Sequence, residues 1–257
     1  MSDLQPWSTS KIDVAKSCTL RFHLKYLKKT PGEPVDRNDG RIGSAVHLIL
    51  EKMLQGDDYK TAFTHAALYS NITYKETLLL KEFETSILRF VGKFDDLKEK
   101  STIVSVTTEQ QVAITEDLRP CDYWDKAAWL RGVIDLAVHV KRQDKTYLLV
   151  IDHKSGEIKD INNYKMQLFS YIVMGLAHYP DIDGVQPAIH WLRAEEALKQ
   201  KPVEWMKMTL LDSIQSDVIP ELRAYVLAAE EAAAQPPRPS LGWYCDFCEY
   251  RKMCPAL

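Results

Sequence analysis

The sequence predicts an α/β fold in which a mixed β-sheet is flanked by helices, with a helical N-terminal part and a cysteine-rich C-terminal tail. Three observations predict this fold. Apolar residues recur with the helical period through about residue 98, segments rich in β-branched residues follow between residues 102 and 152, and three cysteines lie within the last thirteen residues. A chain of 257 residues with 46% hydrophobic content can bury a core of this kind.

The first hundred residues read as helices. Ser8-Thr9-Ser10 offers N-caps for a helix through about Lys29, which would carry Cys18. A turn-rich segment follows over residues 30–40. The next helix has an apolar stripe at helical spacing, formed by Ile42, Val46, Ile49, Leu50 and Met53. Residues 60–98 read as further helix, with an inward face of Leu78, Leu79, Phe83, Ile87 and Phe90.

The pattern then changes to strands. Thr102–Ile114, Trp129–Val140 and Thr146–Asp152 are rich in β-branched residues, which favour extended backbone. The short polar segment Lys141–Lys145 joins the last two. We therefore expect these two strands to pair as an antiparallel hairpin.

The rest of the chain completes the sheet and its covering layer. Asn162-Asn163 can begin a helix that runs to about Tyr179, with an apolar face of Phe169, Ile172, Val173 and Leu176. Strands are expected at Ala188–Leu192 and Val203–Met208, and a last helix at Leu210–Ala234, kinked or broken by Pro220. The extended segment 235–239 leads into the cysteines. We expect one domain over 1–257, with a helical part at 1–100, an α/β core at 101–209 and the C-terminal helix and tail at 210–257.

Composition narrows the classes of function. The net charge of −3 excludes a polybasic nucleic-acid binder as a whole, although a local basic groove remains compatible with it. No apolar run approaches the length needed to span a bilayer, so no membrane association and a cytoplasmic location are expected. Five cysteines, unevenly spread, are too few for a secreted disulfide scaffold. Clustered thiols in a reducing compartment more often bind metal.

Two acidic residues and a lysine lie on the predicted hairpin. Side chains alternate along a strand, so Asp152 and Lys154 project to the same side, and the hairpin brings Asp135 close to Asp152. Neighbouring carboxylates repel each other unless a cation lies between them, and oxygen ligands favour Mg²⁺ or Mn²⁺. The residues therefore suggest a metal site beside a phosphate, whereas an isolated D-x-K is more often a solvated strand end.

The D-x-K segment has companions in a fixed order. The four motifs are Gly43-x-x-x-His47, Gly132-x-x-Asp135, Asp152-x-Lys154 and Gln167-x-x-x-Tyr171. As a set they resemble the RecB-type branch of the PD-(D/E)XK nuclease superfamily. The C-terminal C-x2-C-x5-C, with a distant N-terminal cysteine, resembles the iron–sulfur members of that branch, which include CRISPR-associated exonucleases, AddB-type helicase–nucleases and stand-alone phage exonucleases. The resemblance covers the chain from about Ser8 to Pro255.

The resemblance implies a role for each motif residue. It implies that a Mg²⁺ or Mn²⁺ ion is bound by His47, Asp135, Asp152 and the main-chain carbonyl of His153. Lys154 resembles the catalytic lysine, and Asp152 stands where a glutamate is commoner in the family. Gln167 and Tyr171 resemble the helix pair that orients the active site and touches the DNA. The four ligands of a [4Fe-4S] cluster would be Cys18, Cys245, Cys248 and Cys254.

Several residues carry an open alternative. Structural Zn²⁺ also accepts four thiolates and is the alternative to the iron–sulfur cluster. Glu109 is a candidate second acidic group near the metal, or else a strand-edge charge. Arg41 is a candidate phosphate contact, or else a surface arginine. Cys121 fits no motif, and the His153 side chain is expected to point away from Asp152 and pack.

The resulting functional hypothesis is a Mg²⁺- or Mn²⁺-dependent DNA exonuclease acting in recombination, repair or phage DNA processing. No phosphate-binding G-x-x-x-x-G-K-[ST] loop is present, so this chain carries no motor of that type. A recombination annealing protein, a helicase or a CRISPR integrase would be a candidate partner besides DNA. Two alternatives are the nuclease component of a CRISPR adaptation complex and a non-catalytic DNA-binding module of the same fold.

Overall fold

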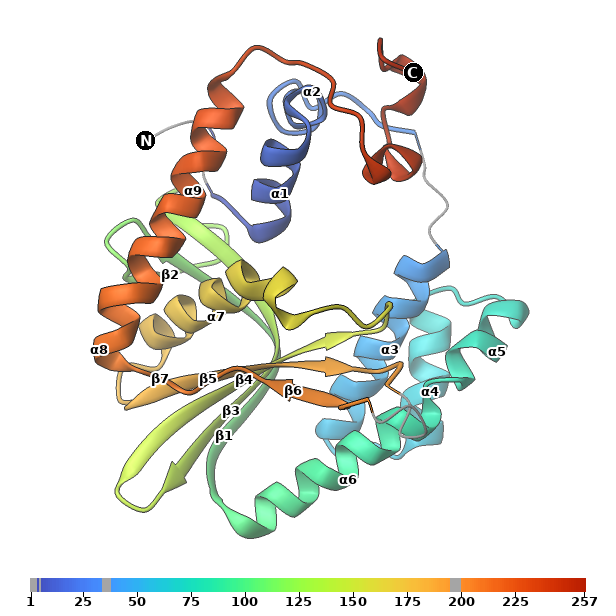
Figure 1. Cartoon of the computed structure of the whole chain (residues 1–257). Coiled ribbons are helices and arrows are strands. Elements are labelled where there is room, and N and C mark those ends of the chain that lie inside the picture. The colour runs from blue at the N-terminus through green and yellow to red at the C-terminus, as the bar shows by residue number, and fades with distance from the viewer. Residues whose placement is uncertain (1–3, 5, 34–37, 195–199) are drawn as a thin grey trace.

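A twisted β-sheet lies at the centre of the protein, with helices on both of its faces (Figure 1). This arrangement is seen in a computed structural model, which describes residues 4, 6–33, 38–194 and 200–257. Within the described residues the sheet has seven strands in the order β2-β1-β3-β4-β5-β6, and β7 also pairs with β5. The expected mixed sheet flanked by helices is confirmed.

The strands lie close to where β-branched composition predicts them. Adjacent strands pair antiparallel except β4 and β5, which pair in parallel. The predicted hairpin is β3–β4, closed by the two residues Gln143 and Asp144 between the paired Arg142 and Lys145. The strands are β1 (Thr102–Thr115), β2 (Pro120–Cys121), β3 (Ala128–Arg142), β4 (Lys145–Lys154), β5 (Gly184–Trp191), β6 (Val203–Trp205) and β7 (Thr209–Leu210).

The N-terminal segment does not form the single helix that the sequence suggests. It consists of α1 (Thr9–Ser17), α2 (Thr19–Phe22) and a π-helical turn, η1 (His23–Leu27). Ser8 caps α1 as expected, because its hydroxyl accepts a hydrogen bond from the Lys11 N–H. Cys18 interrupts the helix with an extended backbone, φ −153°, and its sulfur then caps α2. The cysteine is therefore at a break between helices rather than within one.

A group of four helices covers one face of the sheet. They are α3 (Asn38–Leu54), α4 (Tyr59–Tyr69), α5 (Tyr74–Lys81) and α6 (Glu84–Lys100). The predicted stripe of α3 is buried at Ile42, Val46, Ile49 and Leu50. The inward face predicted for α5 is wrong, since Leu78 and Leu79 are 56% and 42% exposed and Leu80 is buried instead. A capping box formed by Thr73 and Glu76 begins α5 as a separate helix. Its buried face therefore includes Leu80 instead of Leu78 and Leu79.

The opposite face is covered by α7 (Lys165–His178), which makes the crossover between the parallel strands β4 and β5. A short 3₁₀ turn, η2 (Ile161–Tyr164), precedes it, so the α-helix begins after the predicted Asn162-Asn163. Alternate residues of β4 serve the two layers. Leu148 and Val150 pack with α7, whereas Leu149 and Ile151 pack with α3 and α6.

The chain ends in a helical run and a short tail. The run comprises α8 (Leu211–Ser213), η4 (Ile214–Val218) and α9 (Ile219–Ala234), and the tail holds the 3₁₀ turns η5 (Trp243–Phe247) and η6 (Arg251–Met253). Pro220 occupies the first turn of α9 after a π-helical stretch, so the break expected there is present. Figure 1 shows the red tail beside α2, away from the sheet. None of the helices in the described ranges is both long and apolar enough to cross a membrane.

Candidate active site

The sheet is distorted where the predicted acidic residues lie. Along β3, Ile134 packs in the α7 layer, but Leu136 packs in the opposite layer, so the alternation of side chains changes phase at Asp135. On β1 the backbone of Glu109 is left-handed, φ 47°, directly opposite Asp135 in the continued register. Distortions of this kind redirect side chains at functional sites. Here they turn Glu109 and Asp135 toward α3.

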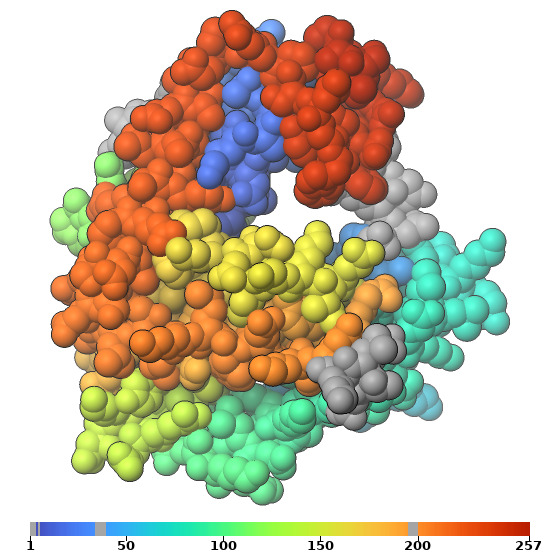
Figure 2. Space-filling view, viewed as in Figure 1, coloured from blue at the N-terminus to red at the C-terminus, as the bar shows by residue number. Residues whose placement is uncertain are grey.

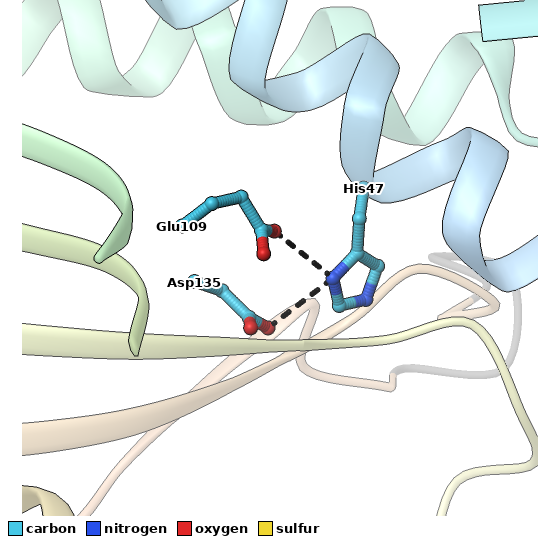
Figure 3. A group of neighbouring side chains, drawn as sticks. All are labelled: His47, Glu109 and Asp135. Carbon is cyan, nitrogen blue, oxygen red and sulfur yellow. Dashed lines mark ion pairs between the residues drawn. The ribbon is translucent and has the colours of Figure 1, made fainter. Parts of the chain in front are cut away.

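Three side chains from three elements meet at this point (Figure 3). His47 of α3 directs its Nδ1 atom to Glu109 Oε1 at 3.4 Å and to Asp135 Oδ2 at 3.6 Å. The potential ligand atoms of the three residues all lie within 4.8 Å of one another. A nitrogen and two carboxylate groups in this arrangement can hold a divalent cation. Glu109, for which a strand-edge charge was the alternative, therefore lies inside the acidic group.

The end of β4 closes the same site through its backbone. The Nε2 atom of His47 lies 3.0 Å from the carbonyl oxygen of His153, and the N–H of His153 donates to Asp135 Oδ2 at 2.7 Å. Gly43 permits the close approach of α3, because a Cβ atom there would lie 3.0 Å from Ser155 Oγ. The glycine of the first motif is thus explained by packing against Ser155, the residue that follows β4.

The electrostatics of the site favour protonated groups in the absence of an added cation. Burial lowers the pKa of His47, but the hydrogen bond to Glu109 and the charges of Asp135 and Glu109 raise it to about 9. Burial raises the pKa of Asp135 to about 7, helped by the charge of Asp152 and opposed by His47 and the His153 N–H. The His47 imidazolium therefore supplies the positive charge that the clustered carboxylates require.

A second network holds Asp152 and Lys154. The Lys154 ammonium lies 2.7 Å from Asp152 Oδ2 and donates to Gln167 Oε1 at 3.2 Å. Gln167 donates to Asp152 Oδ1 at 2.8 Å, and the Tyr171 hydroxyl donates to the same atom at 3.2 Å. Burial and the charges of Asp152 and Asp135 hold the pKa of Tyr171 well above its usual range, so the hydroxyl keeps its proton. The amide and the phenol therefore fix the Asp152 carboxylate.

Gly132 allows α7 to bring Gln167 and Tyr171 to this position. A Cβ atom at Gly132 would lie 3.0 Å from Met174 Cε and 3.5 Å from the Tyr171 ring. The glycine of the G-x-x-D motif therefore lets α7 pack directly on β3. Each glycine of the two motifs serves the approach of one helix to the sheet.

Comparison with known proteins agrees with this geometry. A family model for the PD-(D/E)XK nuclease superfamily matches residues 6–255. The chain belongs to this superfamily. A solved structure from Eubacterium rectale, a protein provisionally assigned as an exonuclease, covers 96% of this chain and 86% of its own length at 12% identity and a TM-score of 0.51, which shows a shared fold. The structure of SSO0001 covers 85% and 94% at 12% identity, but its TM-score of 0.35 is too low to indicate a common fold. No curated protein matches the sequence.

PD-(D/E)XK nucleases use divalent metal ions, and the donor set of this site fits such an ion. The buried Oδ2 atom of Asp152 accepts no hydrogen bond from any described residue, although Lys154 lies beside it. Asp152 does not belong to the compact group of His47, Glu109 and Asp135, because Lys154, Gln167 and Tyr171 surround its carboxylate. Its role as a metal ligand stays a prediction, as does that of the His153 carbonyl.

A pair of buried histidines supports the nuclease site from behind. His153 Nδ1 lies 2.9 Å from His190 Nδ1, and the His190 ring stacks on Phe90 at 4.2 Å. Burial lowers the pKa of both rings, to about 3 for His190, so both are neutral and one Nδ1–H donates to the other. The His153 side chain points into the helical layer, as expected, while its backbone faces the site. His190 lies outside every sequence motif. The one signal for it in the sequence was its place in the predicted strand Ala188–Leu192, which indicates packing.

Arg41 lies near the start of α3 and is engaged in an ion pair. Its guanidinium donates to Glu76 Oε1 from Nε at 3.1 Å and from Nη2 at 2.6 Å. This pairing joins α3 to α5. The Thr73 hydrogen bonds, helped by the one from Arg41, lower the pKa of Glu76 to about 2. A phosphate contact by Arg41 stays a prediction.

The N-terminal Cys18 lies against the C-terminal tail, where its sulfur is 3.9 Å from the Arg238 carbonyl oxygen. Cys18 is buried, and its charge affects the pKa of Tyr244 and of Cys248, which shows that it lies close to the tail. Backbone N–H groups donate to two of the sulfurs, from Arg21 to Cys18 and from Gly242 to Cys245. Among the described residues, no three cysteine sulfurs lie within 4.8 Å of one another, whereas a tetrahedral zinc site holds its sulfurs about 4 Å apart.

Proposed function

We propose that the protein is a Mg²⁺- or Mn²⁺-dependent DNA exonuclease of the RecB type. The observation that carries the proposal is the joining of two networks at one point of the sheet: the His47, Glu109 and Asp135 group, and the Lys154–Asp152 pair held by Gln167. A bound divalent ion supplies an activated water and stabilises the negative charge that develops on a phosphate. The carboxylates and His47 would hold that ion.

The other residues orient the reacting groups. Lys154 lines a polar hollow together with Gln167, so its ammonium can donate to a phosphate oxygen there. Gln167 and Tyr171 keep the Asp152 carboxylate fixed relative to Lys154. A pre-positioned donor of this kind is worth more in a buried site than in water, because it does not reorganise during the reaction.

We further propose that Cys18, Cys245, Cys248 and Cys254 hold a [4Fe-4S] cluster with a structural role. The proposal rests on the resemblance of the C-x2-C-x5-C spacing, with one distant cysteine, to the iron–sulfur members of the family. Hydrogen bonds from backbone N–H groups to sulfur also stabilise thiolate ligands. Free thiols in this number suit a reducing compartment, so a cytoplasmic location is part of the proposal.

The test uses end-labelled linear DNA and closed circular DNA of the same sequence, each incubated with the purified protein and Mn²⁺. We expect shortening of the linear DNA and no cleavage of the circle. Asp135→Ala and Asp152→Ala should abolish cleavage while the far-UV spectrum and DNA binding in Ca²⁺ are kept. Metal-dependent cleavage at near the wild-type rate in either variant would show that the assigned site is wrong, and cutting of the circle would contradict the exonuclease assignment.

A further inference from the structure

The C-terminal tail carries a large exposed aromatic side chain next to the active-site loop. Trp243 begins η5, directly before the cysteine cluster, and is 76% exposed. The ammonium of Lys159 lies 5.9 Å from the centroid of its ring. Lys159 belongs to the segment 155–160, which connects Lys154 at the end of β4 to α7. The tail therefore reaches the loop that leaves the active site, although about 90 residues separate them in sequence.

A polar groove opens at Lys154, where this loop begins. It has a volume of about 530 Å³ and includes the catalytic residues Lys154 and Gln167 in its lining. Its other walls are α1, η2 and α9. The remaining polar lining is formed mainly by Thr9, Ser10, Asp13, Lys16, Asn162 and Asn163.

The lining of this groove suits a nucleic-acid backbone. Hydroxyl and amide groups can donate to phosphate oxygens, and the Lys16 ammonium lies over the Tyr225 ring at 4.2 Å. The one carboxylate of the lining, Asp13, accepts a hydrogen bond from the Tyr225 hydroxyl at 2.5 Å. That bond partly offsets the repulsion between Asp13 and a phosphate.

The N-terminal helix α1 lines the groove, and the tail lies across an opening from it. Figure 2 shows an opening bordered by α1 in blue, the segment after β4 in yellow and the tail in red. The tail is held against the N-terminal helices because the Tyr244 hydroxyl donates to the Ser17 carbonyl at 2.7 Å. Trp243 directly precedes Tyr244. The hydrogen bond of Tyr244 therefore holds the Trp243 backbone beside the loop, while the Trp243 ring itself stays exposed.

We propose that Trp243 is a stacking platform for an unpaired base of a DNA strand that leaves this groove and passes the tail. An exposed indole offers a flat face to any base, and Lys159 lies within reach of the phosphate next to that base. A base inside a duplex is covered on both faces by its neighbours, so away from the duplex ends the platform selects single-stranded DNA. The inference rests on the proposed nuclease function and adds the form of its substrate.

The test measures binding of the full protein to a short fluorescent single-stranded oligonucleotide in Ca²⁺. Trp243→Ala should weaken binding about 10-fold, and Trp243→Phe, which retains an aromatic face, should restore most of the affinity. Trp124→Ala is the matched control, since Trp124 is 73% exposed but stacks with Arg131 near the far end of β3. This control should bind as the wild type does.

Two further probes separate stacking from charge and from damage to the fold. An oligonucleotide of abasic sites keeps the phosphates but lacks bases, so wild type and Trp243→Ala should bind it equally. A closed circular duplex, which has no exposed terminal base pair, should also show no difference between the two proteins. If Trp243→Ala alters the melting temperature or the iron content, the affinities of Trp243→Leu and Trp243→Phe for the single strand are compared instead. Both side chains cover the same surface, but only phenylalanine can stack on a base, so only Trp243→Phe should bind tightly.

The outcomes distinguish this inference from the proposed function. If the wild type cleaves linear DNA in Mn²⁺ but Trp243→Ala binds single strands normally, the stacking platform is wrong and the nuclease assignment stands. An equal loss of affinity for the abasic or duplex probe also overturns the platform. If the wild type binds single strands through Trp243 but cleaves nothing, the proposed function is wrong instead.

Discussion

At Glu109 a glutamate adopts a backbone conformation that costs about 1–2 kcal/mol relative to the right-handed or extended regions. Residues kept in such regions are often found where a side chain must be directed to a site. Here the distortion places Glu109 3.4 Å from His47, opposite Asp135. The unusual backbone and the acidic cluster are both what the proposed cation site requires.

Replacing Glu109 tests whether this carboxylate helps to bind the metal. Glu109→Gln keeps the shape but removes the charge, and it should weaken Mn²⁺ binding about 10-fold or more. Isothermal titration of the protein with Mn²⁺ gives the affinity. Glu116→Gln, an exposed position just beyond the same strand, is the control and should bind Mn²⁺ as the wild type does. Equal affinities for all three proteins would exclude Glu109 from the site.

Lys154 offers a test of geometry against charge. Its ammonium fits between Asp152, Gln167 and the ring of Tyr164, whose centroid is 4.9 Å away. Lys154→Arg keeps the charge, but the planar guanidinium cannot occupy the same place. We expect the single-turnover cleavage rate in Mg²⁺ to fall about 100-fold or more, with DNA binding in Ca²⁺ little changed. A variant that cuts at nearly the wild-type rate would remove Lys154 from the mechanism.

The pKa values of the site predict how metal binding depends on pH. His47 and Asp135 bind metal only after losing their protons, and their pKa values are raised to about 9 and about 7. Below pH 7 both groups are protonated and oppose binding, so the affinity for Mn²⁺ should rise between pH 6 and pH 9. Titrations in buffers of different ionisation enthalpy count the protons released. An affinity that is constant over this range would contradict the raised pKa values.

At the scale of elements, the site depends on how closely two helices approach the sheet. Gly43 permits the close approach of α3, and Gly132 permits that of α7. The α3 helix carries His47 four residues after Gly43, and α7 carries Gln167 and Tyr171 four residues apart. The register of β3 and β4 then places Asp135 opposite Asp152 where the ladder ends at Leu136 and Ile151. Helix approach and strand register together position the six motif side chains, His47, Asp135, Asp152, Lys154, Gln167 and Tyr171.

A pair of glycine variants tests the packing of α7 on β3. Gly132→Val places new atoms against Met174 and Tyr171, and it should lower the free energy of unfolding by about 1–3 kcal/mol. Gly92 lies in α6 and a Cβ atom there meets nothing within 4 Å, so Gly92→Ala should raise the same quantity by about 0.5–1 kcal/mol. Urea unfolding of both variants measures the two changes, and a Gly132→Val protein as stable as the wild type would refute the packing argument.

The sequence could predict those parts of the structure that depend on local pattern. The three long strands, the hairpin and α3 follow from composition and periodicity, and Asp152 and Lys154 share a side because strands alternate. The left-handed backbone at Glu109 has no local signal, since neither a glycine nor an asparagine marks it. The break at Cys18 likewise depends on tertiary contacts. The exposure of Leu78 follows from the capping box at Thr73, which was not recognised because residues 60–98 read as one helical pattern.

At the scale of the whole molecule, the two ends of the chain are tied together. Arg21 and Lys25 both pair with Glu249, at 2.7 and 2.9 Å, and the Tyr250 hydroxyl donates to the Thr30 carbonyl. These contacts join the tail to the N-terminal segment, beside α2 and away from the sheet (Figure 1). The ends therefore form one unit that closes over the active-site face, and the proposed cluster would strengthen it.

A serine at position 18 tests the cluster without disturbing the helix that Cys18 caps. Cys18→Ser keeps an N-cap acceptor for the Arg21 N–H but removes a thiolate. We expect anaerobically purified wild type to be brown, with about four irons per chain, and Cys18→Ser to lose most of the iron and some solubility. Cys121→Ser, outside the group, should retain the full iron content. Colourless wild-type protein with stoichiometric zinc would refute the cluster.

The tie between the chain ends also fixes an order of events during synthesis. Trp7 can add to β3 once residue 131 has left the ribosome, because its backbone bonds to Trp129 and Arg131. The helices α1 and α2 are completed later. Asp13 of α1 bonds to Tyr225 of α9, while Cys18 and Arg21 contact Arg238 and Glu249 of the tail, each more than 200 residues further along the chain. Until then the apolar side chains of Ile12, Ala15 and Phe22 lack part of their cover, and the nascent chain is open to aggregation or to chaperone capture over that interval.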